Sequence, residues 1–308
     1  MEKFEQIFNI INGQAEKFEQ QDMTYLDGVL ATLEDTLEGS FEWQVEGATK
    51  EDMRKAIQIA ILKGMRKNTQ PNHQMTPDTL GLLVSYFVEQ FYDKELANGT
   101  ISVADLALGT GNLLFTLMNA LEGKIEATGV EVDELLIRLA AATAELTQQP
   151  VTLYRQDALE SLLVDPVDAI VCDLPVGYYP NEDVAIDYEL CAAEGMSYSH
   201  HLFIEQAMKH TKEGGYLFFL VPATLFESEQ AKDLHKFIQK YAWIQAVIQL
   251  PASMFSSRAH EKSILILQKQ GAELKAPREV LLAKVPNMTN KQALAMFFEK
   301  VQMWKENK

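Results

Sequence analysis

Three acidic side chains each follow an apolar, strand-like segment of this 308-residue sequence: Asp105, Glu131 and Asp157. A carboxylate at the end of one strand can simply cap the next helix, but three in succession favour a shared binding task. The carboxyl ends of parallel strands form one edge of a sheet, and ligands bind there. Glu131 has the position of a ribose acceptor, and Asp157 that of an acceptor for the exocyclic amine of adenine. These residues predict a site for an adenosine-containing cofactor.

A glycine turn, Gly109 to Asn112, follows the first of these segments and begins a helix. Glycines allow the backbone to approach a ligand closely, and the first N–H groups of a helix are free to bind one. The dinucleotide fingerprint needs a third glycine where this chain has Leu114, which argues against NAD. Glu131 lies twenty positions after Gly111, a spacing that suits the ribose of NAD or of another adenosine cofactor.

The sequence VCDLPVGYYP, residues 171–180, places a carboxylate and two tyrosines after a fourth apolar segment. A cofactor bound over the first three strands would present its reactive end toward the fourth. Asp173 is therefore the predicted acceptor for a substrate amine. Pro175 removes a backbone donor and stiffens the turn, and Tyr178 or Tyr179 is predicted to form an aromatic lid.

The elements that must position these residues change in character along the chain. From about Ile101 to Gln270, apolar strand-like segments alternate with helical ones, which indicates a mostly parallel, doubly wound α/β sheet of the Rossmann-like kind. The preceding residues show only helical spacing. We expect an all-helical N-terminal domain over 1–95, the core over 96–270, and an extension over 271–308 that packs on the core.

The chain has 44 acidic and 27 basic residues, a formal net charge of −17. Non-specific affinity for DNA rests on many Lys/Arg–phosphate contacts, so we expect the isolated chain to bind nucleic acid weakly. Two small basic islands, residues 63–67 and 258–262, could contact phosphate or form solvated surface.

The remaining composition gives further expectations. The two cysteines lack metal-ligand spacing, so no metal site and no disulfide framework are predicted. Cys172 and the pair His200-His201 are expected to be structural. No membrane span or signal peptide is expected, and the predicted location is the cytoplasm.

Several segments together resemble class I S-adenosylmethionine-dependent methyltransferases, and most closely the N6-adenine DNA methylases of type I restriction-modification modification subunits. ADLALGTGNLLFTL is similar to the cofactor glycine motif, and QMTPDTLGLLVSYF to the upstream Thr-Pro segment. DAIVCDLPVGYY lies where the family has Asn/Asp-Pro-Pro-Tyr/Phe, and GGYLFFLVPATLF and LPASMFSSRAHEKSILILQK are similar to later core segments. The resemblance covers about residues 70–270 and looks like the stand-alone subgroup of Gram-positive bacteria.

This resemblance implies that S-adenosyl-L-methionine is the cofactor and that its methyl group goes to an amino nitrogen, with N6 of adenine in DNA as the target. A base in duplex DNA would have to be flipped out of the helix. The residues implied at the catalytic centre are Asp173, Pro175, Tyr178 and Tyr179. The residues implied at the cofactor are Thr76, Pro77, Asp105, Leu108, Gly109, Thr110, Gly111, Asn112, Glu131, Val132, Asp157, Ala158 and Asp173.

The four-residue catalytic motif departs from the family pattern, because it reads Asp173-Leu174-Pro175-Val176. The acid and the third-position proline match, but the second proline and the aromatic residue do not. Stacking of a base on an aromatic ring contributes about 1–3 kcal/mol, so a nearby tyrosine would have to replace this surface. Only about forty residues follow Gln270, so sequence-specific reading of DNA would need a partner chain or the N-terminal helices.

Two alternatives remain open at this point. The acceptor could be another amine or amide, in RNA or in a protein glutamine. The chain could also be a cofactor-binding regulatory protein without catalysis, because intact cofactor residues beside an altered catalytic motif fit that case as well.

Overall fold

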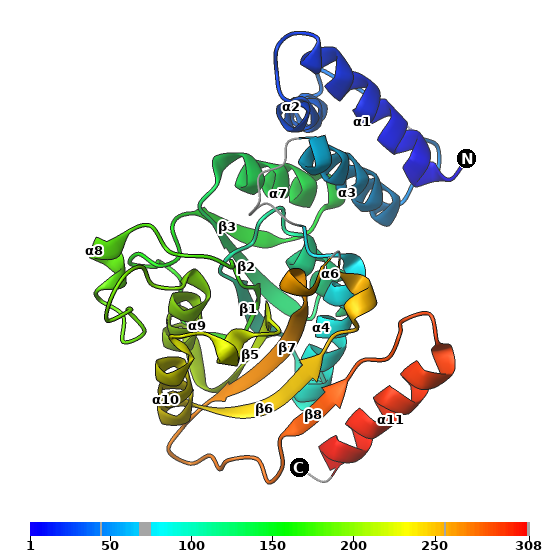
Figure 1. The fold of residues 1–308 in the computed structure, drawn as a ribbon. Helices are drawn as coiled ribbons and strands as arrows, with labels where there is room; N and C mark the ends of the chain where they lie inside the picture. Colours follow the sequence, from blue (N-terminus) through cyan, green and yellow to red (C-terminus); the bar gives the residue numbers. More distant parts are fainter. Residues whose placement is uncertain (44, 68–74, 256, 307–308) are drawn as a thin grey trace.

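An eight-stranded sheet forms the centre of the computed structural model, which describes residues 1–43, 45–67, 75–255 and 257–306 (Figure 1). The strand order is β3-β2-β1-β4-β5-β7-β6-β8. The strands are β1 (Ile101–Asp105), β2 (Ile125–Glu131), β3 (Val151–Arg155), β4 (Val167–Asp173), β5 (Thr211–Pro222), β6 (Ala242–Gln249), β7 (Lys262–Lys269) and β8 (Leu281–Lys284).

Neighbouring strands pair in parallel except at β7, which is antiparallel to both β5 and β6. The chain builds outward from β1 to β3 and then returns to add β4 on the other side of β1. The strand order therefore reverses between β1 and β4, the place where open α/β sheets bind ligands. The predicted α/β class with a mostly parallel, doubly wound sheet is confirmed.

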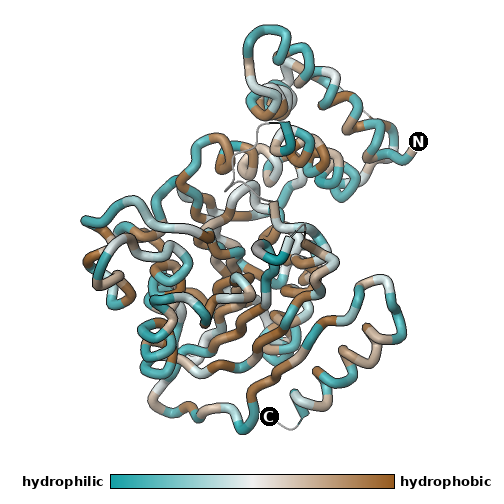
Figure 2. The backbone as a smooth tube through the Cα atoms, in the orientation of Figure 1, coloured by the Kyte–Doolittle hydropathy of each residue, from teal (hydrophilic) through white to brown (hydrophobic). Residues whose placement is uncertain are grey.

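Two hydrophobic cores cover the two faces of this sheet. In β4, Ala169 and Val171 belong to one core and Ile170 and Cys172 to the other, as the alternation of side chains along a strand requires. Figure 2 shows hydrophobic residues along the central strands, with hydrophilic ones on the outer turns. The helices packed on the sheet are α4 (Asp78–Phe91), α5 (Asp93–Asn98), α6 (Asn112–Ala120), α7 (Glu134–Thr147), α9 (Ser199–Lys209), α10 (Ala231–Tyr241) and α11 (Lys291–Glu306).

The N-terminal helices pack together around a third core, which the outer face of α7 completes with Leu139 and Ala142. This layer lies at the end of the molecule farthest from α10 (Figure 1). Its helices are α1 (Lys3–Glu19), α2 (Tyr25–Leu37) and α3 (Lys50–Lys67).

The packing of α4 and the C-terminal segment bears on the predicted domains. Helix α4 contributes Leu83, Val84 and Phe87 to the core of the sheet, so its packing favours a division before α4 rather than at residue 95. After residue 270, β8 extends the sheet beside β6, and α11 adds Phe297 to the same core as α4. The domain limits themselves stay a prediction.

The remaining elements are short. They are α8 (Glu182–Ala185) and the 3-10 helices η1 (Leu225–Glu227), η2 (Ala252–Met254) and η3 (Arg258–His260). No helix in the described part of the chain has the length and apolar character needed to cross a membrane.

Candidate functional site

The glycine turn after β1 has the positive backbone φ angles that its glycines allow. Gly109 and Gly111 have φ angles of 58° and 82°, in the left-handed region that favours glycine. A Cβ atom on Gly111 would lie 2.5 Å from the ring of Phe115, so a larger residue would also displace that buried ring. Gly111 is the N-cap of α6, and the turn therefore places the first residues of α6 at the carboxyl ends of the strands.

Glu131 fastens this turn to the end of β2. One carboxylate oxygen accepts a hydrogen bond from the Gly109 N–H at 2.7 Å, and the other accepts one from the Asp133 N–H at 2.9 Å. A carboxylate oxygen has two lone pairs, so each oxygen can still accept a ribose hydroxyl. Glu131 thus fits the predicted ribose role and also sets the shape of the turn.

Asp105 lies beneath the turn rather than at its surface. Its side chain is 1% exposed, and its Oδ1 accepts the Ala107 N–H at 3.1 Å. Burial raises the pKa of Asp105 to about 7, against the lowering effect of that hydrogen bond. Asp105 therefore lies on the buried side of the turn and holds the backbone at Ala107.

Asp157 is shared with one of the two candidate lid tyrosines. Its Oδ1 accepts the Leu159 N–H at 2.9 Å, and its Oδ2 accepts the Tyr179 hydroxyl at 2.7 Å. The Tyr179 side chain is 6% exposed and packs in the core that α9 and α10 complete. Burial first, and then Asp157, hold the pKa of Tyr179 well above its usual range. Tyr179 therefore supports Asp157 and has no free ring face for an acceptor.

Tyr178 has the opposite environment. Its side chain is 56% exposed, and its ring stacks on Tyr198 with centroids 5.0 Å apart and planes 15° apart. The backbone on both sides holds this pair, since Tyr179 N–H donates to the Ser197 carbonyl at 2.9 Å and Ser199 N–H donates to the Gly177 carbonyl at 2.8 Å. The sequence analysis did not single out Tyr198, which lies about twenty residues further along the chain.

Asp173 ends β4 with both carboxylate oxygens in use. Its Oδ2 accepts the Thr76 hydroxyl at 2.8 Å, and its Oδ1 forms an ion pair with the Lys262 ammonium group. The side chains of Asp173 and Lys262 are 16% and 18% exposed. The predicted Thr-Pro segment thus meets the predicted acceptor residue directly, and Lys262 joins them from β7.

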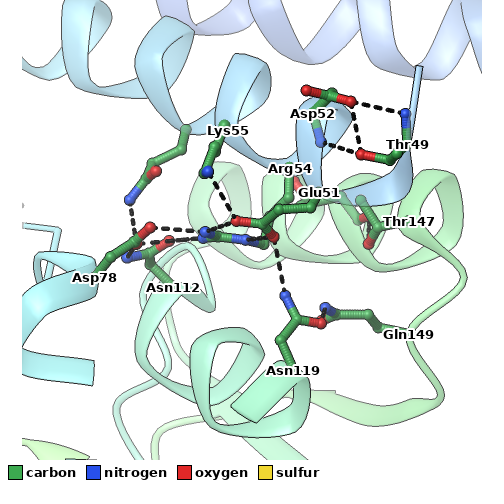
Figure 3. A network of polar contacts seen from close by, with 12 residues as sticks. Thr49, Glu51, Asp52, Arg54, Lys55, Asp78, Asn112, Asn119, Thr147 and Gln149 are labelled. Atoms are coloured by element: carbon green, nitrogen blue, oxygen red, sulfur yellow. Dashed lines mark hydrogen bonds and ion pairs between the residues drawn. The ribbon is translucent and has the colours of Figure 1, made fainter. Parts of the chain in front are cut away.

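A buried arginine, Arg54 of α3, ties the N-terminal helices to this centre (Figure 3). It donates to Asp78 at 2.7 Å and to Asn112 at 3.1 Å, and its side chain is 5% exposed. Asn112 in turn donates to the Thr76 carbonyl at 2.6 Å and to Asp78 at 2.9 Å. Burial acts to raise the pKa of Asp78, but hydrogen bonds from Arg54 and Asn112 lower it overall. Sequence reasoning missed Arg54; its spacing of three residues from Ile57, on the buried face of the helix, was the available signal.

The other predicted cofactor residues line the same strand ends with different exposure. Leu108, Thr110 and Ala158 are buried, whereas Val132 is 61% exposed. Pro77 is the N-cap of α4. These placements are compatible with a cofactor between the turn and the exposed Val132.

Cys172 and the pair His200-His201 are buried in the structure. His200 and His201 are 5% and 0% exposed, and burial lowers their pKa values to about 4 and about 3, so both rings are neutral at pH 7. Burial also raises the pKa of the Cys172 thiol. Among the residues that the structure describes, no three His, Cys, Asp or Glu side chains gather as a metal site would require.

The parallel sheet with its antiparallel β7, together with the glycine turn after β1 and the acid after β2, has the architecture of a class I S-adenosylmethionine-dependent methyltransferase. More narrowly, the chain belongs to the N-6 DNA Methylase family, whose sequence profile matches residues 72–304.

Individual proteins and solved structures are similar to this chain over most of its length. The Bacillus subtilis protein YtxK, described as uncharacterized, is 48% identical over 254 residues, which cover 82% of this chain and 76% of YtxK. A crystal structure from Listeria monocytogenes, named as a candidate class I S-adenosylmethionine-dependent methyltransferase, is 40% identical with a TM-score of 0.90 and covers 98% of this chain and 99% of that one. The methyltransferase subunit of a Streptococcus thermophilus type I restriction-modification system shares the fold at 13% identity, with a TM-score of 0.67 over 98% of this chain and 74% of that one.

Proposed function

We propose that this protein is an S-adenosylmethionine-dependent N-methyltransferase that acts on N6 of adenine in DNA. The observation that carries the proposal is the position of Asp173. It ends β4 beside the strand-order reversal and is linked to the glycine turn by a chain of hydrogen bonds through Thr76 and Asn112. This is where a methyl acceptor would meet the reactive end of a cofactor bound over β1 to β3.

The residues at the strand ends fit the proposed cofactor. Glu131 has free lone pairs for the ribose hydroxyls, and Asp157 for the amine of adenine. The turn at Gly109 and Gly111 leaves no side chain over the backbone, and Thr76 lies on the side toward Asp173. When bound, S-adenosyl-L-methionine supplies a sulfonium-activated methyl group.

Asp173 would accept a hydrogen bond from the acceptor amine and so orient the nitrogen lone pair. Such positioning is the main contribution that the chain can make, because the amine need lose no proton before transfer. Pro175 stiffens the turn that follows. The exposed Tyr178 ring, backed by Tyr198, supplies the planar surface that Val176 cannot, and a stacked base would gain about 1–3 kcal/mol there.

A partner chain for target recognition is part of the proposal. The net charge of −17 leaves little general attraction for DNA. Related solved structures are described as subunits of type I restriction-modification systems, and one of these descriptions concerns complex assembly. A location in the cytoplasm follows from a DNA substrate in a bacterial cell.

A second candidate is a protein that binds the cofactor but does not catalyse methyl transfer. The ion pair of Asp173 with Lys262 favours it, because a cation rather than a neutral donor holds the predicted acceptor carboxylate. The same experiment separates the two candidates.

The test is incubation with methyl-labelled S-adenosylmethionine and separate pools of DNA, RNA and protein, followed by nucleoside analysis. The proposal expects label in N6-methyladenine from the DNA pool, and at least about a hundredfold less with Asp173→Ala. Label in the RNA or protein pool would contradict the adenine-in-DNA proposal. Cofactor binding without label in any pool, even at a DNA concentration high enough to offset the missing partner chain, would support the non-catalytic candidate.

A further inference from the structure

Lys262 is the cation that lies nearest to the proposed reaction centre. It begins β7, and its ammonium group is paired with Oδ1 of Asp173. Both side chains are more than four-fifths buried, so this pair is not an ordinary solvated surface contact. Since Thr76 donates to Oδ2, the carboxylate has a donor from the chain on each oxygen.

An acceptor amine at Oδ1 of Asp173 would have to share that oxygen with the Lys262 ammonium group, because the chain already donates to both carboxylate oxygens. The bond from Lys262 joins two opposite charges, whereas a neutral amine brings no charge to the carboxylate, so the amine displaces Lys262 poorly on its own. Leaving the pair would also strand a largely buried cation, which is unfavourable without a new anionic partner. An acceptor that carries an anionic group can pair with the Lys262 ammonium group. Asp173 is then free to bind the amine, and the cation is not left unpaired.

The segment that leads into Lys262 is suited to an anion. Arg258 lies four residues earlier in η3 and is exposed. Two cations, Arg258 and Lys262, against the single acid Glu261 give residues 257–262 a net positive charge in an otherwise acidic chain, which favours a negatively charged ligand there.

We propose that the ion pair with Lys262 keeps neutral amines from binding Asp173, and that a phosphate group of the acceptor binds Lys262 in place of Asp173. The site therefore selects nucleotides over amines without phosphate. This inference rests on the proposed function and deepens it. It assigns Lys262 a part in choosing the acceptor, through the oxygen that it shares with the acceptor amine. A protein glutamine, which carries no phosphate, would be disfavoured.

The experiment compares adenosine 5′-monophosphate with adenosine, which carry the same amine and differ by the phosphate. Binding is measured by calorimetry or saturation-transfer NMR with S-adenosylhomocysteine in excess, so that neither probe competes for the cofactor pocket. The wild type should prefer the monophosphate by about tenfold, the factor that one hydrogen bond to a charged group contributes. Lys262→Met should lose this preference and bind adenosine more tightly than the wild type does.

Two variants complete the design. Lys262→Arg keeps the charge and should keep the preference for the monophosphate. Lys236→Met removes an exposed lysine of α10, paired within its own helix with Asp233, and should change nothing. If Lys262→Met fails to fold, Lys262→Gln provides the uncharged side chain, and unchanged affinity for S-adenosylhomocysteine verifies that each variant is intact.

An unchanged preference in the uncharged variant, or no preference in the wild type, overturns the inference. The proposed function is judged separately, by transfer of label to DNA. Methylated DNA with an unchanged preference would therefore refute only the role of Lys262, and a lost preference without methylated DNA would refute only the adenine-in-DNA proposal.

Discussion

The two halves of the candidate site are built in different ways. In the cofactor half, at the ends of β1 to β3, the partners of Glu131 and Asp157 lie 2 or 22 residues away in the sequence. In the acceptor half, around Asp173 and the loop at 174–198, Asp173 is held by Thr76, 97 residues away, and by Lys262, 89 residues away. The partners in the cofactor half are therefore close in the sequence, although Tyr179 reaches Asp157 from the loop after β4, and the acceptor half is held by elements far apart in the sequence.

This difference has a functional consequence. The cofactor half keeps free lone pairs on Glu131 and Asp157, ready for the hydroxyls and amine of a ligand. The acceptor half has its central carboxylate already paired with a cation. We expect cofactor binding to need little rearrangement, and acceptor binding to need a change at Lys262.

The largest effect is expected where one residue supports both halves. Arg54 donates to Asn112 at the cofactor turn, and Asn112 holds the Thr76 segment that contacts Asp173. Arg54→Ala removes the bonds of one buried guanidinium group to Glu51, Asp78 and Asn112, which costs about 3 kcal/mol of unfolding free energy. Urea unfolding measures this loss of unfolding free energy. The control is Lys55→Ala, at an exposed neighbouring position, whose unfolding free energy should lie within about 0.5 kcal/mol of the wild-type value. A variant as stable as that control would show that the network does not join the halves.

The next effect separates the two halves. Asp173→Ala removes the proposed acceptor and should reduce turnover by about 100- to 1,000-fold, the effect of losing one preorganised hydrogen-bonding group. Cofactor affinity should stay within a few-fold, because Glu131 and Asp157 are untouched. Asp173→Asn keeps an acceptor oxygen and should retain more activity than the alanine variant. Equal loss of cofactor affinity and turnover would mean that the halves are not separable.

The converse change concerns the cofactor half. Glu131→Ala leaves the Gly109 and Asp133 N–H groups without their acceptor and removes the predicted ribose contact. We expect S-adenosylmethionine affinity to fall by about ten- to a hundredfold, at about 1.4 kcal/mol for each factor of ten. The rise in melting temperature with cofactor should shrink accordingly. An unchanged thermal shift would refute the ribose assignment.

A pH-dependent effect tests the buried acid of the cofactor half. The folded-state pKa of Asp105, about 7, lies above the value near 4 expected for an unfolded chain. The folded protein thus holds a proton that the unfolded chain has lost, and this stability is present below about pH 4 and lost as the pH rises to about 7. Asp105→Asn should remove this decline. Urea unfolding across that pH range, on both proteins, should give curves of different slope; parallel curves would contradict the buried position.

The smallest effect distinguishes the two tyrosines. Tyr179→Phe deletes the hydrogen bond to Asp157 and should lower the unfolding free energy by about 1 kcal/mol. Tyr178→Phe, at an exposed ring, should leave stability unchanged. Thermal unfolding of the pair, side by side, measures the difference. The reverse order would place the stacking surface at Tyr179.

The same contrast explains what the sequence could predict. Apolar strands alternating with helices specify the parallel sheet, and carboxylates directly after strands must reach its carboxyl edge, so the positions of Glu131 and Asp173 followed from local pattern. The choice between Tyr178 and Tyr179 did not, because no periodicity governs a loop. The pairing of Lys262 with Asp173 depends on the strand order, in which β7 lies beside β5 and β5 beside β4. The spacing of residues along the chain does not predict the order of strands in a sheet. Helix α4 was grouped with the N-terminal helices because helical spacing does not say which surface covers it.

The central claim is that the strand ends of β1 to β3 bind S-adenosylmethionine, and calorimetric titration of the wild-type chain tests it most directly. The account predicts saturable binding of S-adenosylmethionine at one molecule per chain, and no binding of NADH under the same conditions. Binding of NADH without binding of S-adenosylmethionine would contradict it.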